Sequence, residues 1–185
     1  MKRITAIVLA LILIFTLASC TRPVSAPSSV PVNMADISTP ALDGKPYTVY
    51  GIQFEANESW KIFEMDGATA VFFNNSLMCY FVFTDPEGIG AGTLSRKGVE
   101  SVVAGFCETF GSNAVAGTIS EVIVNEKKFW TVNVSSTLEG QQVEATVWLY
   151  GDDTAWYAFA FVAIPEDYET YLPYAQALLK SIKLP

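Results

Sequence analysis

The 185-residue sequence contains no histidine and only three cysteines. Without imidazole the chain cannot build a Ser-His-Asp or Cys-His nucleophile system, and it lacks the usual general base near neutral pH and the commonest metal ligand. The sequence therefore predicts no metal site and no cofactor, and it favours a protein that is not an enzyme.

Basic residues are scarce as well, with 11 Lys and Arg against 19 Asp and Glu. Two of the basic residues, Lys2 and Arg3, lie in a segment that we expect to be removed, which leaves nine basic residues, 19 acidic ones and a formal charge of −10. The remaining Lys and Arg are scattered along the chain. Because proteins bind phosphate backbones through clustered Lys and Arg, we expect no nucleic-acid partner.

The first twenty residues have the order of an export signal. Lys2-Arg3 is followed by an uncharged apolar run from Ile4 to Leu17 and then by the small residues Ala18 and Ser19, as in secretory signals. The run is shorter than the roughly 20 apolar residues that span a bilayer. Residues 1–19 are therefore predicted to be a signal peptide.

The sequence Leu17-Ala18-Ser19-Cys20 resembles the bacterial lipobox. The resemblance implies cleavage before Cys20 and lipidation of its thiol by palmitate-like acyl chains, which would hold the protein on the extracytoplasmic face of the cell membrane. Two or three acyl chains give a stable anchor. The alternative is an ordinary secretory signal that ends in an incidental cysteine.

Three regions are expected along the chain. The signal peptide is followed at 20–46 by a lipidated cysteine and a flexible tether, because this segment is rich in Pro, Ser, Ala and Val and has no helix or strand period. Residues 47–185 have the length of one globular domain.

Within the domain, hydrophobic patterns predict strands, two helices and short turns. Two hairpins are expected, 48–54 with 60–65 and 68–73 with 77–84. An amphipathic helix is expected at 95–110, with Ser95 as its N-cap and Gly111 at its end. An antiparallel meander of four strands is expected at 115–124, 128–137, 143–150 and 154–164. A last helix at 167–182 would carry Pro173 in its first turn or at a kink.

The segment from Phe54 to Trp60, the long meander and the ending from Leu178 to Lys183 resemble the PsbP/Mog1-like group over residues 47–183. Asn57 stands where that group often has proline. The resemblance implies an α+β fold, an α/β/α sandwich with a central, mainly antiparallel sheet and a C-terminal helix. Known members act mainly in binding and assembly, and the group supplies no catalytic residue to carry over.

Two sets of side chains are candidate site residues. Cys79 and Cys107 could form a disulfide, or both could be free thiols in apolar surroundings. Aromatic residues suited to protein or glycan contact form a candidate binding surface, namely Tyr47, Tyr50, Trp148, Tyr150, Tyr171 and Tyr174.

The sequence thus predicts a membrane-anchored, noncatalytic binding or assembly module. Besides the membrane, its partner would be an unknown envelope protein, a glycan or a small ligand. The alternative is a hydrolase of envelope glycans, with one carboxylate from Asp85 or Glu87 and another from Asp152 or Asp153. No local motif fixes such a pair, and both segments also have the composition of ordinary loops.

Overall fold

A computed structural model of the chain describes residues 31–74, 76–87, 89–111 and 113–185. The expected signal peptide, Cys20 and the first part of the tether lie outside these residues. In the described part of the chain, no helix is both long and apolar enough to cross a membrane.

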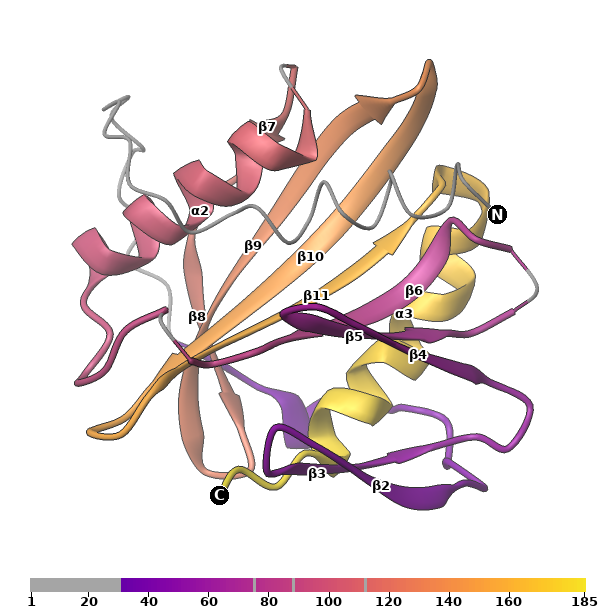
Figure 1. Cartoon of the computed structure of the whole chain (residues 1–185), viewed down its shortest axis with the longest axis horizontal. Helices are drawn as coiled ribbons and strands as arrows, with labels where there is room; N and C mark the ends of the chain where they lie inside the picture. The colour runs from indigo at the N-terminus through magenta and orange to yellow at the C-terminus, as the bar shows by residue number, and fades with distance from the viewer. Residues whose placement is uncertain (1–30, 75, 88, 112) are drawn as a thin grey trace.

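A nine-stranded sheet forms the centre of the domain (Figure 1). Its strands follow the order β1 (Val32–Asn33), β8 (Ser120–Val124), β9 (Lys127–Leu138), β10 (Gln141–Gly151), β11 (Trp156–Ala163), β6 (Cys79–Thr84), β5 (Ala68–Phe72) and β4 (Lys61–Met65). The short β7 (Val115–Ala116) pairs with β9. The β1–β8 pair is parallel, whereas the other pairs are antiparallel. The expected meander is confirmed.

Tight turns hold this meander in register. The β8–β9 turn has positive φ angles at Asn125 (49°) and Glu126 (65°), and the β9–β10 turn has them at Glu139 (49°) and Gly140 (84°). Two successive positive φ angles give the turn a twist that matches the right-handed twist of the flanking strands. Strands β9 and β10 can therefore pair continuously from Gln141 with Leu138 to Leu149 with Trp130.

A separate hairpin, β2 (Lys45–Val49) and β3 (Ile52–Ala56), lies outside the main sheet. The single strand expected at 48–54 is divided by a turn at Tyr50 and Gly51, whose φ angles are 51° and 76°. The hairpin predicted between 48–54 and 60–65 is therefore wrong, since β4 pairs with β5 instead. Tyrosine rarely adopts a positive φ, so Tyr-Gly is a weak turn signal in a sequence.

The lead-in segment, residues 31–44, is part of the folded domain. Val32 and Asn33 pair with β8, and the following 3-10 turn η1 (Met34–Asp36) places Met34 in the core with 2% of its surface exposed. Ile37 and Leu42 pack against the same core. The expectation that flexible tether continues to Pro46 is wrong for these residues, because Met34 is buried and Ile37 and Leu42 are half-buried against the core, although Val32 is exposed.

Two α-helices complete the fold in the part of the chain that the structure describes. The expected capping of α2 (Arg96–Phe110) is confirmed, since the Ser95 hydroxyl accepts a 3.2 Å hydrogen bond from the N–H of Gly98 and Gly111 follows the helix. Helix α3 (Pro165–Ser181) begins two residues earlier than expected. Pro165 occupies its first position, and Pro173 lies in the interior, where it has no N–H to donate.

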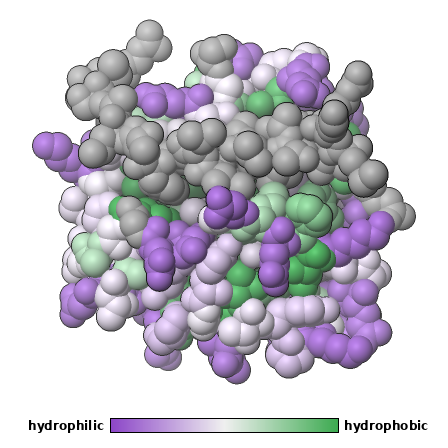
Figure 2. All heavy atoms as spheres, in the orientation of Figure 1, coloured by the Kyte–Doolittle hydropathy of each residue, from purple (hydrophilic) through white to green (hydrophobic). Residues whose placement is uncertain are grey.

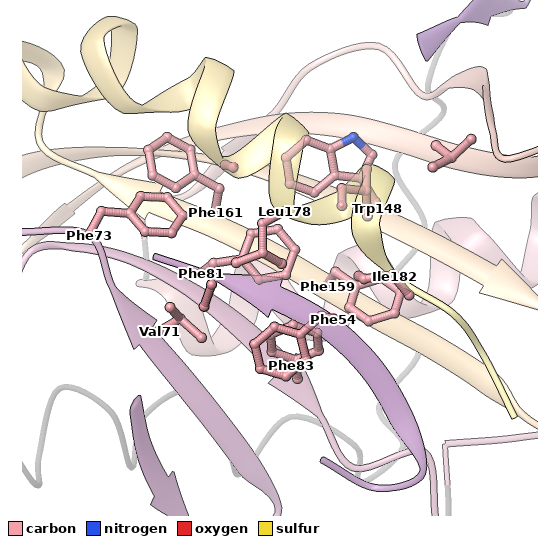
Figure 3. Packing of buried hydrophobic residues seen from close by; sticks show 14 of the residues in the cluster. Phe54, Val71, Phe73, Phe81, Phe83, Trp148, Phe159, Phe161, Leu178 and Ile182 are labelled. Atoms are coloured by element: carbon pink, nitrogen blue, oxygen red, sulfur yellow. The ribbon is translucent and has the colours of Figure 1, made fainter. Parts of the chain in front are cut away.

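The helices cover opposite faces of the sheet. One face packs against α3 and the β2–β3 hairpin through many aromatic rings, which we call the aromatic cluster (Figure 3). The other face packs against α2 through mainly Val and Ala side chains, which we call the aliphatic cluster. The protein therefore has the expected α+β sandwich with a mainly antiparallel sheet and a C-terminal helix.

The cysteines lie on opposite faces of this sheet. Cys79 belongs to the aromatic cluster and Cys107 packs against the aliphatic cluster, and both are free thiols. Of the two alternatives for this pair, the structure has the free thiols and not the disulfide, because a bridge needs Cβ atoms about 4 Å apart. Burial, and then the nearby Asp167 carboxylate, raises the pKa of Cys79 to about 12. The Cys79 thiol is thus protonated and a poor nucleophile at neutral pH.

Candidate functional site

A groove of about 700 Å³, open to solvent, lies where the lead-in segment, the β8–β9 hairpin and the end of α3 meet. In Figure 1 this is the region around the C-terminus and the nearby turn of β8 and β9. We call this hollow the C-terminal groove. It is lined by Thr39, Pro40, Leu42, Glu55, Val124, Asn125, Lys127, Phe129, Ala177, Leu179, Lys180, Ser181, Ile182, Lys183 and Leu184.

The lead-in segment is fastened to α3 by one side chain. The Nζ atom of Lys180 donates to the carbonyl oxygen of Ile37 at 2.5 Å and lies 3.3 Å from the hydroxyl of Thr39. Lys180 occupies the last turn of α3, where a positive charge also interacts favourably with the helix dipole. This lysine therefore joins two walls of the groove.

The C-terminal tail forms a third wall and is held by backbone pairing. Gln53 and Lys183 exchange two backbone hydrogen bonds of 2.9 and 2.8 Å. The hydroxyl of Ser181 accepts from the N–H of Glu55 at 2.9 Å and donates to the carbonyl oxygen of Leu178 at 2.7 Å. The tail is thus an added strand-like edge of the β2–β3 hairpin.

The β8–β9 turn closes the groove from the other side. The side-chain amide of Asn125 donates to the carbonyl oxygens of Lys180, at 2.7 Å, and Ile182, at 3.3 Å. These carbonyls lie at the end of α3, where helix carbonyls lack partners within the helix. Asn125 is suited to this position because asparagine tolerates the positive φ that the turn requires.

The groove concentrates positive charge in an acidic protein. Lys127, Lys180 and Lys183 line it, and Glu55 is the acidic residue among its lining residues. In the described residues, no carboxylate lies within 4 Å of these three ammonium groups. Three other basic residues have such partners, in the pairs Lys45–Glu58 (2.9 Å), Arg96–Glu100 (3.3 Å) and Lys128–Glu121 (2.9 Å).

The six aromatic residues of the predicted binding surface do not form one surface. Trp148 is 3% exposed and stacks on Phe81, so its placement at the surface is wrong. Its strand is covered by α3, and alternation on β10 turns Trp148 toward that helix. Tyr150 is half-buried at the edge of the groove, where its ring stacks on Phe129 with centroids 5.0 Å apart.

The other four tyrosines are half-buried and fall into two groups. Tyr47 stacks on Phe54 of the β2–β3 hairpin, and Tyr50 lies in the turn of that hairpin. Tyr171 and Tyr174 lie next to each other on α3, with ring centroids 6.1 Å apart. Tyr47, Tyr171 and Tyr174 pack at the margin of the aromatic cluster.

Exposed large apolar side chains are dispersed. In the described residues these are Val32, Phe63, Leu77 and Val115, on four separate segments. On the face that Figure 2 shows, apolar areas alternate with hydrophilic residues. The described surface therefore favours the groove over a broad apolar patch as the place where a ligand binds.

Of the acidic residues considered for hydrolysis, Asp152 and Asp85 stabilise turns. One oxygen of Asp152 accepts from the hydroxyl of Thr154 (2.6 Å) and from the N–H groups of Thr154 (2.9 Å) and Ala155 (3.1 Å). Partial burial acts to raise the pKa of Asp152, but these hydrogen bonds and the positive charge of Lys127 outweigh it and lower the pKa. Asp85 accepts similarly from the N–H of Glu87 at 2.9 Å. In the described residues, no three Asp, Glu or Cys side chains are grouped to hold a metal ion.

Two tryptophans pin the loop between β6 and α2. The indole N–H of Trp156 donates to the carbonyl oxygen of Gly92 at 2.7 Å, and that of Trp130 donates to the carbonyl oxygen of Leu94 at 3.1 Å. A Cβ atom on Gly90 would lie 2.6 Å from the Trp156 ring. Glycine is therefore needed in this loop for close packing.

Sequence reasoning missed the groove because its lysines come from separate segments. Lys180 and Lys183 follow the apolar positions of α3, and Lys127 follows a turn. Lysine is common at both kinds of position, because its charge stabilises the C-terminal ends of helices and its side chain is readily solvated in exposed turns. The one available signal was the concentration of three of a small number of basic residues around two element ends.

No family model and no curated protein sequence matches this chain. Solved structures are similar in fold. A crystal structure from Bacteroides thetaiotaomicron VPI-5482 has a TM-score of 0.56 and 11% identity, and the match covers 78% of this chain but 49% of that one. The chain thus spans about half the length of that protein.

The solution structure of cyanobacterial PsbP (CyanoP) from Synechocystis sp. PCC 6803 matches along nearly its whole length. Its TM-score is 0.52 at 11% identity, over 76% of this chain and 92% of that one. LpqN of Mycobacterium tuberculosis, described as involved in cell envelope biogenesis, has a TM-score of 0.48 at 13% identity over 84% and 90% of the two chains. The chain therefore has a PsbP-like α+β fold.

Proposed function

We propose that the protein is a lipid-anchored, extracytoplasmic binding module that holds a ligand in the C-terminal groove without changing it chemically. The address rests on the order of residues 1–20, in which a charged start, an apolar run and small residues precede Cys20. Lipid on Cys20 would fix the domain close to the membrane through a short connection to the lead-in segment.

The observation that carries the binding role is the construction of the groove. Its volume of about 700 Å³ lies within the range of roughly 300–1,000 Å³ that small-molecule sites occupy. Four segments that are distant in sequence are fastened around it by hydrogen bonds of Lys180, Ser181, Asn125 and Lys183. Such a site is largely formed before a ligand arrives, which lowers the entropic cost of binding.

The polar groups of the groove favour binding over hydrolysis. The hydroxyl of Ser181 is occupied by two backbone partners, and Thr39 lies beside the ammonium group of Lys180. Glu55 has no second carboxylate beside it among the lining residues, whereas glycoside hydrolysis requires two carboxyl groups across a cleft. The lining residues thus offer positive charge and apolar contact.

The anchor is tested by growing cells with an alkyne analogue of palmitate and measuring label on the protein. We expect the wild type and a Cys107→Ala control to be labelled and Cys20→Ala to be unlabelled. Equal labelling of the Cys20→Ala protein would show that the lipid is attached at another residue and not at Cys20.

The groove is tested by photocrosslinking in cells. A photoreactive phenylalanine replaces Leu184, which lines the groove, or Leu77, an exposed leucine outside it. We expect a recurrent adduct, identified by mass spectrometry, from position 184 and not from position 77. The same adducts at both positions, or none at position 184, would contradict a ligand site in the groove.

A further inference from the structure

We propose that the C-terminal groove takes a small amphiphilic anion, whose carboxylate or phosphate head contacts Lys127, Lys180 and Lys183 and whose hydrocarbon part lies on the apolar floor. This inference rests on the proposed function in one respect, namely that the groove is the ligand site. It adds the chemical class of the ligand.

The charged residues are distributed unevenly over the protein. The described residues contain eight Lys and Arg and all 19 Asp and Glu of the chain. Such a surface repels anions in general. Three of the eight basic residues nevertheless line one groove, and no carboxylate among the described residues lies within 4 Å of them, although acidic residues are abundant elsewhere. Lys127 interacts electrostatically with Asp152 from beyond this distance, so the positive charge of the groove is only partly compensated within the protein, as a site for an anion requires.

The ammonium group of Lys180 is held in place by neutral oxygen atoms. It has three donors, and it contacts the neutral oxygens of Ile37 and Thr39. These contacts position the group at the groove wall but leave its charge uncompensated. A hydrogen bond to an anionic oxygen is shorter and roughly twice as strong as one to a neutral oxygen. An anion in the groove would therefore gain a preformed, charged donor.

Lys127 and its neighbour Lys128 lie on opposite faces of the sheet. Residues alternate along β9, so Lys127 shares the α3 side of the sheet with Phe129, whereas Lys128 shares the other side with Trp130. The Nζ atom of Lys127 lies 5.1 Å from the centroid of the Tyr150 ring, a cation–π distance. Lys128 instead pairs with Glu121 at 2.9 Å. Two adjacent lysines thus differ in face and in charge compensation.

The floor of the groove is apolar. Leu42, Phe129, Leu179, Ile182 and Leu184 line it beside the lysines. Of these, Phe129, Leu179 and Ile182 are buried in the aromatic cluster, whereas Leu42 and Leu184 are half-buried. A purely polar anion would leave the exposed apolar surface of Leu42 and Leu184 in water, and a neutral hydrocarbon would leave the ammonium groups without an anionic partner. A molecule with an anionic head and an apolar tail satisfies both.

Glu55 places one negative charge in the groove, and removing that charge tests the sign of the ligand. It is the carboxylate among the lining residues, and it would repel an anionic head. Replacing Glu55 with glutamine removes this repulsion while keeping the size of the side chain, so the variant Glu55→Gln should bind an anion more tightly.

The test uses the lipid-anchored protein in phosphatidylcholine nanodiscs and a diazirine-bearing dodecyl phosphate as a photoreactive probe. Competition with unlabelled dodecyl phosphate gives the affinity, and mass spectrometry gives the labelled peptides. We expect labelling at the groove, roughly tenfold weaker binding in Lys127→Gln/Lys183→Gln, and about twofold tighter binding in Glu55→Gln. The matched control Lys97→Gln/Lys128→Gln, which also removes two positive charges but lies on the α2 side of the sheet and outside the groove, should bind within about twofold of wild type.

Two competitors separate head from tail. Inorganic phosphate, which lacks the tail, and lauroylglycerol, which lacks the charge, should each compete at least about tenfold more weakly than dodecyl phosphate. Nanodiscs containing phosphatidylglycerol distinguish the source of the ligand. Loss of probe labelling would assign the head group to a bilayer lipid, and unchanged labelling would assign it to a free amphiphile, and both results support an anionic amphiphile.

Unchanged affinity in Lys127→Gln/Lys183→Gln, or equal competition by lauroylglycerol, would overturn this inference. If photocrosslinking from position 184 in cells still captured a recurrent ligand, the groove would stand as the binding site and only the anionic head would be wrong. If position 184 also captured nothing, the proposed function would fail with it. Lys180→Gln is left out of the primary variant because Lys180 also fastens the lead-in segment.

Discussion

The two faces of the sheet are built from different side chains. On the α3 face, rings such as Phe54 and Phe83 stack with centroids 4.3 Å apart, and Phe81 stacks on Trp148. On the α2 face, the strands contribute mainly Val and Ala, and the aromatic members are Phe72, Tyr80, Phe106 and Phe110. The aromatic face therefore concentrates burial in a few large side chains, whereas the aliphatic face distributes it over many small ones.

The largest expected effect compares neighbours on one strand. Phe161 and Val162 are both fully buried on β11 but face the aromatic and the aliphatic cluster respectively. Phe161→Ala should lower the free energy of unfolding by about 3–5 kcal/mol, and Val162→Ala by about 2 kcal/mol, because the larger ring leaves the larger cavity. Urea denaturation measures both. Equal losses would contradict the contrast between the faces.

The next effect concerns the edge of the aliphatic cluster, where a glycine contacts an indole. A Cβ atom on Gly151 would lie 2.7 Å from Trp156 and 2.8 Å from Leu94. Gly151→Ala should therefore destabilise the protein by about 1–3 kcal/mol through overpacking and alter the fluorescence of Trp156. Gly140→Ala is the control, since a Cβ there meets nothing within 4 Å and only its φ of 84° is unfavourable. Normal Trp156 fluorescence in Gly151→Ala would argue against this contact.

A smaller effect depends on pH. Burial, and then Asp167, raises the pKa of Cys79 on the aromatic face from 9.0 to about 12. Since the folded pKa is the higher one, the stabilisation is complete below pH 9 and is lost as the pH rises toward 12. The free energy of unfolding should fall by about 1 kcal/mol between pH 7 and 10 on this account. The decrease, measured by denaturation under reducing conditions, should be smaller in Cys79→Ala; an identical decrease would contradict the assignment.

The smallest effects are opposite in sign. The hydroxyl of Tyr80, on the aliphatic face, is buried and has no hydrogen-bond partner among the described residues, whereas that of Tyr168, on the aromatic face, bonds to Thr146. Tyr80→Phe should stabilise the protein by about 1 kcal/mol, and Tyr168→Phe should destabilise it by about 1 kcal/mol. Thermal unfolding of the two variants measures the difference. A loss of stability in Tyr80→Phe would mean that its hydroxyl has a partner in solution.

The sequence predicted those elements whose signals are local. The periodic apolar positions and Ser95 cap of α2, and the turns of the meander, all depend on residues close together in the chain. The β2–β3 hairpin was missed because its turn uses a tyrosine at positive φ. The lead-in segment was missed because three separated apolar residues, Met34, Ile37 and Leu42, give no periodic pattern, yet each finds a place in the core.

The candidate site could not be predicted for a related reason. A surface residue and a buried one have the same sequence signature when both belong to a strand, as Trp148 shows. The groove depends on contacts between residues more than 50 positions apart, such as Asn125 with Lys180 and Lys180 with Ile37. Contacts of this kind follow from the tertiary arrangement and leave no local pattern.

The position of the C-terminal tail affects how the protein can be tagged. Leu184 lines the groove, and a Cβ atom on Gly51 would lie 3.1 Å from the ring of Pro185. An affinity tag fused after Pro185 would therefore start at the rim of the groove and obstruct it. The turn at Glu139 and Gly140 is exposed and lies at the opposite end of the long strands from the C-terminus (Figure 1). A tag inserted in that turn would leave the groove open.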